Sequence, residues 1–280
     1  MSKTMKTQAQ KAAEFEALHK APGCFVIPNP WDPGSARILA GLGFKALTTT
    51  SAGYARSIGV TDYKAGRENV IEHIRLMVPA IDIPLAADLE DGFGPKPQDC
   101  ADTIRLCAEA GLVGGSIEDF TGDRSNPIYE TAKAAERVRA AAEAAKKLPF
   151  KFMLCARAEN YLNGKPDLAD TIKRLQAYQD AGADVLFAPG LATAEDIRTV
   201  CSSLDRPFNI MRGPRNELLS VDQLAELGVK RVSLGGLMQA AAMTGFITAA
   251  KELAGGTFGF TKTMVPGTEI DGLLNKGAGG

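Results

Sequence analysis

The chain has 280 residues, of which 45% are hydrophobic, and its 32 Lys and Arg nearly balance 33 Asp and Glu for a net charge of −1. This length and composition suit one large folded domain without disordered segments. A near-neutral chain offers no basic surface to attract nucleic acid or a membrane, so neither is an expected partner.

The N-terminal residues 1–20 predict a polar amphipathic helix without the apolar core of a signal peptide. No apolar run approaches the roughly 18 residues of a transmembrane helix, so we expect a cytoplasmic protein. Five cysteines without a CxxC pair indicate neither a disulfide framework nor a zinc site, and most should be small buried residues. His19 and His73 fall in expected helices, where solvated or capping roles are expected and His-based metal sites or Ser-His-Asp triads are disfavoured.

Eight β-rich runs alternate with eight helical runs along the chain, which is typical of βα units with parallel strands. The strands are expected at 24–28, 45–50, 84–90, 114–119, 151–157, 184–189, 207–211 and 230–235, and the helices at 34–42, 66–80, 97–110, 130–147, 167–181, 193–203, 220–227 and 236–253. Eight units in about 250 residues predict a single-domain (β/α)8 barrel. Its core should span about 22–254, between an N-terminal helix and a C-terminal arm at 255–280 where the pattern is lost. An open doubly wound sheet is the alternative, because periodicity cannot show closure.

Acidic residues follow the middle strands, at the end of a barrel where active sites are built. Strand alternation predicts that Asp88 and Glu90 share one side of their strand, and Glu118 ends the next one. Three carboxylates without histidine or thiolate select a hard cation, Mg²⁺ or Mn²⁺. Each acid alone could instead cap a helix or pair with an arginine, a role that suits Asp91 and Asp119 better because they point the other way.

Other strand ends offer groups for binding anions. Arg157 ends the fifth strand, and its planar guanidinium could bind a carboxylate or a developing enolate, or form an ion pair with the same acids. The run TTSAGY at 49–54 offers a hydroxyl and N–H groups in a glycine-containing turn that suits a small carboxylate, although a bare turn is equally compatible. No lysine ends a strand, which argues against a Schiff-base aldolase. The glycine pair 235–236 could hold a phosphate, but plain strand-to-helix packing is the favoured interpretation.

Several ordered segments carry a family resemblance: NPWDPGSARILAGLGFKAL, TSAGYARSIGVTD, PLAADLEDGFG, GGSIEDFTG, MLCARAEN and QAYQDAGADVLF. Through them the chain resembles the isocitrate lyase and phosphoenolpyruvate mutase superfamily over residues 15–250. The resemblance implies a Mg²⁺ site in which Asp88 is a direct ligand while Glu90 and Glu118 act largely through water. It also implies a substrate carboxylate bound by Ser51 with the backbone of Ala52 and Gly53.

Two further site residues and the assembly follow from the same resemblance. Asp62 matches the acidic residue that closes GVTD, and Arg157 matches the family arginine near the substrate oxygen. The resemblance also implies a homotetramer in which pairs of subunits swap a C-terminal helix.

The chain departs from the family in the loop after the fourth strand. Members that cleave isocitrate or methylisocitrate carry a Lys-Arg/Lys-Cys-Gly-His loop, whereas this chain has FTGDRSNPIY, so those two activities are not expected. Phosphonate-processing members carry Lys-Thr-Asn there, and Arg124, Ser125 and Asn126 keep a comparable polar loop. Their tryptophan before the substrate serine corresponds to Thr49, and Trp31 could fill that pocket from the first strand.

The leading functional hypothesis is a Mg²⁺-dependent lyase or decarboxylase that cleaves a C–C bond of a small 2-oxo or 2-hydroxy diacid. The enolate that forms would be stabilised by Mg²⁺ and Arg157 and protonated by Tyr54 or Arg124. A phosphonomutase or phosphonopyruvate hydrolase, supported by Arg124 and Asn126, is the second hypothesis. A barrel that has lost catalysis and only binds a ligand is the third.

Overall fold

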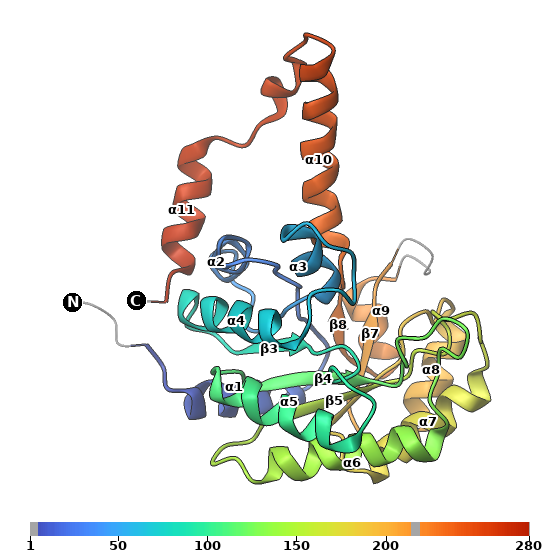
Figure 1. Ribbon diagram of the computed structural model, residues 1–280. Helices are drawn as coiled ribbons and strands as arrows, with labels where there is room; N and C mark the ends of the chain where they lie inside the picture. Colours follow the sequence, from blue (N-terminus) through green and yellow to red (C-terminus); the bar gives the residue numbers. More distant parts are fainter. Residues whose placement is uncertain (1–4, 214–218, 280) are drawn as a thin grey trace.

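The computed structural model describes residues 5–213 and 219–279 (Figure 1). Its eight parallel strands form one curled sheet in the order β1-β8-β7-β6-β5-β4-β3-β2. The strands are β1 Phe25–Val26, β2 Leu47–Thr48, β3 Leu85–Asp88, β4 Gly114–Glu118, β5 Met153–Arg157, β6 Val185–Phe187, β7 Phe208–Met211 and β8 Val229–Ser233.

The circular strand order confirms the predicted barrel fold. The first strand pairs with the last, Phe25 beside Arg231. The Thr48 N–H also donates to the Pro28 carbonyl at 3.1 Å, so backbone hydrogen bonding links β2 to the segment that follows β1. A doubly wound sheet leaves its first and last strands unpaired with each other, so that alternative is excluded.

Within the described residues, nine helices fall where a helix is expected, and η1 Val78–Ala80 continues one of them. They are α1 Gln8–Lys20, α2 Pro33–Gly41, α4 Arg67–Met77, α5 Pro97–Glu109, α6 Thr131–Lys146, α7 Leu168–Asp180, α8 Ala194–Ser202, α9 Val221–Glu226 and α10 Leu237–Ala254. None of the described helices is long and apolar enough to cross a membrane.

Two helices are additional to those expected. Helix α3, Ser51–Ser57, begins directly after β2, so the expectation of a turn at 49–54 is wrong. Thr50 is its N-cap, because its side-chain oxygen accepts the Gly53 N–H at 3.2 Å.

The second additional helix lies in the tail. Helix α10 extends away from the barrel, and after η2 (Gly259–Thr263) the helix α11, Gly267–Gly277, returns to pack on α2 (Figure 1).

Both histidines are buried, each 5% exposed, so the expectation of solvated or capping residues is wrong. The His19 ring packs edge-on between Phe15 and Phe25 where α1 meets the barrel interior. The His73 ring stacks on Tyr54 at a centroid distance of 3.9 Å. Burial is the main cause that lowers the pKa of His19 to about 3 and that of His73 to about 4, so both rings are neutral near pH 7.

Candidate active site

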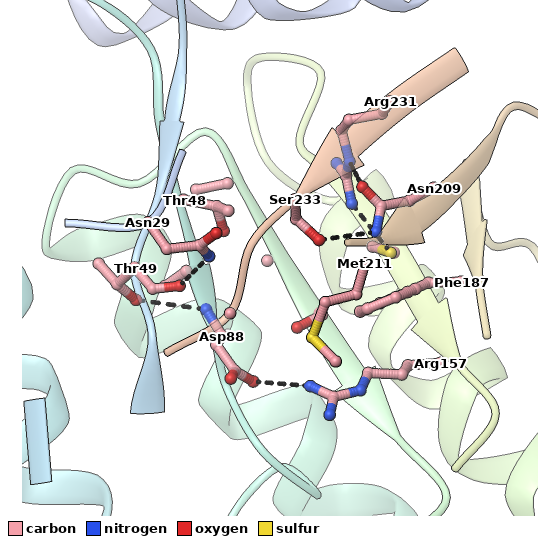
Figure 2. Close-up of a pocket in the computed structure, with 16 residues that line it drawn as sticks. Asn29, Thr48, Thr49, Asp88, Arg157, Phe187, Asn209, Met211, Arg231 and Ser233 are labelled. Carbon is pink, nitrogen blue, oxygen red and sulfur yellow. Dashed lines mark hydrogen bonds and ion pairs between the residues drawn. The ribbon is translucent and has the colours of Figure 1, made fainter. Parts of the chain in front are cut away.

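A cavity of about 40 Å³ opens among the strands, around the carboxyl ends of several of them (Figure 2). Its polar lining comes from seven of the eight strands or the residues just after them: Asn29, Thr48, Thr49, Asp88, Ser116, Arg157, Asn209, Arg231 and Ser233. Phe187 and Met211 add apolar walls. This is the position at which barrels of this kind place their chemistry.

Arg157, at the end of β5, sits among three carboxylates. Its Nη1 lies 3.2 Å from Glu118 Oε2 and 3.6 Å from Asp88 Oδ1, and its Nε donates to Glu159. Burial alone would lower the pKa of Arg157, but these acids raise it well above its ordinary value. The guanidinium is therefore a permanent cation with a fixed orientation, and both interpretations of Arg157, ion pair and anion-binding group, remain compatible with its position.

Glu118 is held by a second partner that sequence reasoning missed. The Tyr63 hydroxyl donates to Glu118 Oε1 at 2.6 Å. Burial raises the pKa of Glu118, while Arg157 opposes that rise. Glu159 lies inside MLCARAEN, one of the segments that carry the resemblance, whereas Tyr63 is the residue just after the segment that ends at Asp62.

Helix α3 presents Ser51 to the acids. Ser51 Oγ donates to Asp88 Oδ2 at 2.9 Å. Burial, and then the charge of Asp88, raise the pKa of Asp62, and a hydrogen bond with Ser51 opposes that rise. The structure thus brings together Ser51, Asp62 and Asp88. Two other predicted binding groups are placed differently. The Gly53 N–H is already bonded to Thr50, while the Trp31 Cβ lies beside Gly53 and does not line the cavity.

Glu90 lies next to Asp88 because of a turn in the backbone and not because of strand alternation. Strand β3 ends at Asp88, so the prediction that Asp88 and Glu90 share one side of this strand is wrong. Instead, Glu90 has a left-handed backbone with φ of 50°, and its N–H donates to Asp88 Oδ1 at 3.3 Å. Its side chain is 4% exposed. Burial, and then Asp88 and Asp62, raise its pKa to about 8.

The acids fit a hard cation in their chemistry, but they are not gathered around one point. Across the described part of the chain, no three His, Cys, Asp or Glu side chains form a group that could hold a metal ion. Glu90 Oε1 is nevertheless buried without a hydrogen-bond partner, which is costly for a carboxyl oxygen unless a cation compensates it. An all-oxygen set of Asp88, Glu90 and Glu118 is the ligand type that Mg²⁺ prefers.

Asp119 has the structural role expected of it. Its carboxylate accepts hydrogen bonds from the Tyr178 hydroxyl at 2.5 Å, from Arg174 at 3.1 Å and from the Glu159 N–H at 2.8 Å. Asp119 thereby anchors the backbone of Glu159, which in turn holds Arg157. Asp91 accepts the Phe93 N–H at 2.9 Å in the turn that follows Glu90.

The loop between β4 and α6 lies outside the cavity. Arg124 and Asn126 are exposed and are not among the lining residues. Asp123 organises the loop by accepting the Ser125 N–H at 2.8 Å. Tyr54 also points elsewhere, because its hydroxyl donates to the Asn69 carbonyl at 3.0 Å.

Comparison with known proteins gives a consistent set of relatives. The family model for phosphoenolpyruvate phosphomutase matches residues 15–254. A solved structure from Burkholderia cenocepacia J2315, provisionally named a lyase/mutase, is 54% identical with a TM-score of 0.91 and covers 94% of this chain and 95% of its own. The 2-methylisocitrate lyase of Bacillus subtilis is 27% identical over 81% of this chain and 76% of its own length. The oxaloacetate decarboxylase of Pseudomonas savastanoi pv. phaseolicola is 26% identical over 77% and 75%.

Proposed function

The chain belongs to the phosphoenolpyruvate phosphomutase family and is an enzyme, and on that premise we propose that it cleaves a carbon–carbon bond of a small 2-oxo or 2-hydroxy diacid through an enolate. The observation that carries the proposal is the Arg157 guanidinium, whose side chain is 12% exposed and which Asp88, Glu118 and Glu159 hold at the cavity that Asp88 lines. Relatives named as a lyase and a decarboxylase support the class of reaction.

Arg157 would stabilise the charge that develops on the substrate. Breaking the bond next to a 2-oxo carbon leaves its electron pair on an enolate, and a fixed cation beside the enolate oxygen lowers the barrier. Because Glu159 and Glu118 already hold the guanidinium, little reorganisation is needed at the moment of reaction. Ser51 Oγ, which donates to Asp88, would turn its hydrogen bond to the substrate carboxylate.

Asp88, Glu90 and Glu118 would hold Mg²⁺ or Mn²⁺. The unpaired Glu90 oxygen and the mutual repulsion of these acids support this assignment. When bound, the cation supplies positive charge near the substrate carboxylate and 2-oxygen. Asp62, beside Ser51, would help to orient the substrate through that hydroxyl. The Tyr54 hydroxyl donates to Asn69, an arrangement that gives no support to its role as proton donor.

Phosphonate chemistry is the second candidate, because the matching family model is that of a phosphomutase and because Arg124, Ser125 and Asn126 supply a polar loop. Both residues at its tip would have to move to reach the cavity, since Arg124 and Asn126 are exposed and do not line it. This candidate therefore ranks below carbon–carbon cleavage.

A substrate panel tests the proposal. The protein would be mixed with 2-oxo and 2-hydroxy diacids and with phosphonopyruvate, with Mg²⁺ and with a chelator, and products followed by proton and phosphorus NMR. We expect metal-dependent carbon–carbon cleavage of at least one diacid. Turnover of phosphonopyruvate alone would favour the second candidate, and metal-independent cleavage would contradict the cofactor assignment.

A further inference from the structure

Arg231 is a second arginine that lines the same cavity, and the mechanism above does not use it. It lies on β8 and is 6% exposed. Its Nε donates to Asn209 Oδ1 at 2.8 Å, its Nη2 to Cys155 Sγ at 3.2 Å, and its Nη1 lies 3.3 Å from His19 Nε2. Within residues 5–213 and 219–279, no Asp or Glu side chain is within ion-pair distance of it.

The partners of Arg231 do not balance its charge. Asn209 is neutral by nature, burial raises the pKa of the Cys155 thiol, and burial lowers that of His19, so all three are uncharged near pH 7. A buried cation without a counter-charge is costly. A guanidinium has five N–H groups, and the contacts with Asn209, Cys155 and His19 leave two of them for another acceptor. An anion that enters the cavity would satisfy both requirements.

The cavity connects Arg231 to the acid cluster. Figure 2 shows Asp88 and Arg157 together at one end and Arg231 with Asn209 and Ser233 at the other, with Met211 and Phe187 between the two ends. Asn209 is itself fixed, because its amide donates to Ser233 Oγ at 3.0 Å. A volume of about 40 Å³ exceeds the roughly 10–15 Å³ that one water needs, so a carboxylate-sized group has room. Phe187 and Met211 form apolar walls that suit the carbon chain between two charged ends.

We propose that Arg231, aligned by Asn209, binds the second carboxylate of a dicarboxylate substrate whose first carboxylate lies near Ser51 and Arg157. The inference rests on the proposed function and adds the residue that distinguishes diacids from monoacids. Charged hydrogen bonds in a buried site discriminate strongly, because their absence leaves the protein group unpaired.

A matched pair of ligands tests this assignment. Lactate and malate share the 2-hydroxy acid and differ in the second carboxylate, and their binding with Mg²⁺ is measured by isothermal titration calorimetry. We expect the protein to bind malate about tenfold or more tightly than lactate. Arg231→Gln should bring the two affinities within about twofold of each other while lactate affinity is retained. Arg198→Gln, an exposed arginine on α8, should keep the preference.

Two additional variants separate recognition from a structural role. His19→Gln disturbs another partner of Arg231 from outside the cavity lining and should keep the preference, whereas a structural Arg231 would make both variants weaken both ligands alike. If Arg231→Gln does not fold, Asn209→Ala removes the acceptor that aligns Arg231, together with the hydrogen bond to Ser233, and should reduce the preference. An equal affinity for both acids in the unaltered protein, or a preference that survives Arg231→Gln, overturns the inference but leaves the proposed function. Binding of neither acid with Mg²⁺ contradicts both.

Discussion

Glu90 combines backbone strain, burial and charge repulsion in one residue. Its left-handed φ of 50° is uncommon for a non-glycine residue, and one of its carboxyl oxygens is buried without a partner. A strained residue is kept in place only where the surrounding structure stabilises it by other contacts, and such residues are often found at functional sites. Here Arg137 from α6 donates to the carbonyls of Asp91 and Gly94, which holds the turn that follows Glu90.

The pKa of Glu90 gives a prediction about stability. Its folded pKa of about 8 lies above the ordinary 4.5, so the contribution of Glu90 to the stability of the metal-free protein is fully present below pH 4.5 and is lost as pH rises through 8. Glu90→Gln should therefore be the more stable protein at pH 9, by on the order of 3 kcal/mol, and show little difference at pH 5. Thermal unfolding at both pH values measures this. The exposed Glu143→Gln is the control, and an equal effect at both pH values would contradict the assignment.

Tyr63 gives a prediction about geometry. Tyr63→Phe removes the 2.6 Å hydrogen bond to Glu118, which leaves a buried carboxylate less satisfied and Arg157 less firmly held. We expect a loss of about 1–3 kcal/mol in stability and a fall in kcat of about tenfold with the substrate identified by the panel. Tyr161→Phe is the control, since it is the Tyr63 hydroxyl that donates to Glu118. An unchanged kcat would show that Glu118 does not depend on Tyr63.

At the scale of elements, the βα alternation was predictable because it reflects buried strands and amphipathic helices. Helix α3 was missed because seven residues with an internal glycine carry little periodicity, although Thr50 before it is a capping signal. Helix α11 was missed because Gly267, Gly272 and Gly277 give it the composition of a loop.

The site was predictable to the extent that barrel geometry collects strand ends. That geometry brought Asp88, Glu118 and Arg157 together. It could not show that β3 ends at Asp88, or that Tyr63 reaches Glu118 from a loop. Such contacts depend on how loops fold over the barrel, which spacing along the chain does not encode.

The glycines of α11 have distinct roles, which a pair of substitutions can separate. A Cβ on Gly277 would overlap the Arg37 carbonyl of α2, whereas a Cβ on Gly272 would meet no atom within 4 Å. Gly277→Ala should therefore detach α11 from α2, measured as faster amide hydrogen exchange in both helices. Gly272→Ala should leave exchange unchanged and stabilise the helix by up to about 1 kcal/mol. Equal exchange in the two variants would contradict the packing described here.

At the scale of the whole molecule, α10 exposes an apolar surface that a monomer would leave in water. Gln239 is its one buried residue, while Phe246, Ile247 and Leu253 are all exposed. Large contiguous apolar surfaces mark interaction sites. We propose that a second copy of the chain covers α10 and that the assembly is a homotetramer, which this arm and the family resemblance support.

A charge on this surface tests the assembly. Phe246 is 66% exposed on α10, and Leu76 is 64% exposed on α4. Phe246→Glu should shift the mass measured by light scattering toward the monomer, because a buried unpaired charge is costly at an interface. Leu76→Glu, equally exposed but on another surface, should keep the larger assembly. A monomeric unaltered protein, or an unchanged mass for Phe246→Glu, would contradict the proposal.

The most direct test of a metal-assisted carboxylate site at Asp88 is the binding of oxalate, a mimic of the enolate, measured by isothermal titration calorimetry. We expect oxalate to bind when Mg²⁺ is present and not when it is chelated, and Asp88→Asn to weaken this binding by about 100-fold. Asp102→Asn, at a half-buried carboxylate near Arg105 on α5 that does not line the cavity, serves as the control. Oxalate binding that is the same with Mg²⁺ and with chelator, or that survives Asp88→Asn, would contradict a metal-assisted carboxylate site at Asp88.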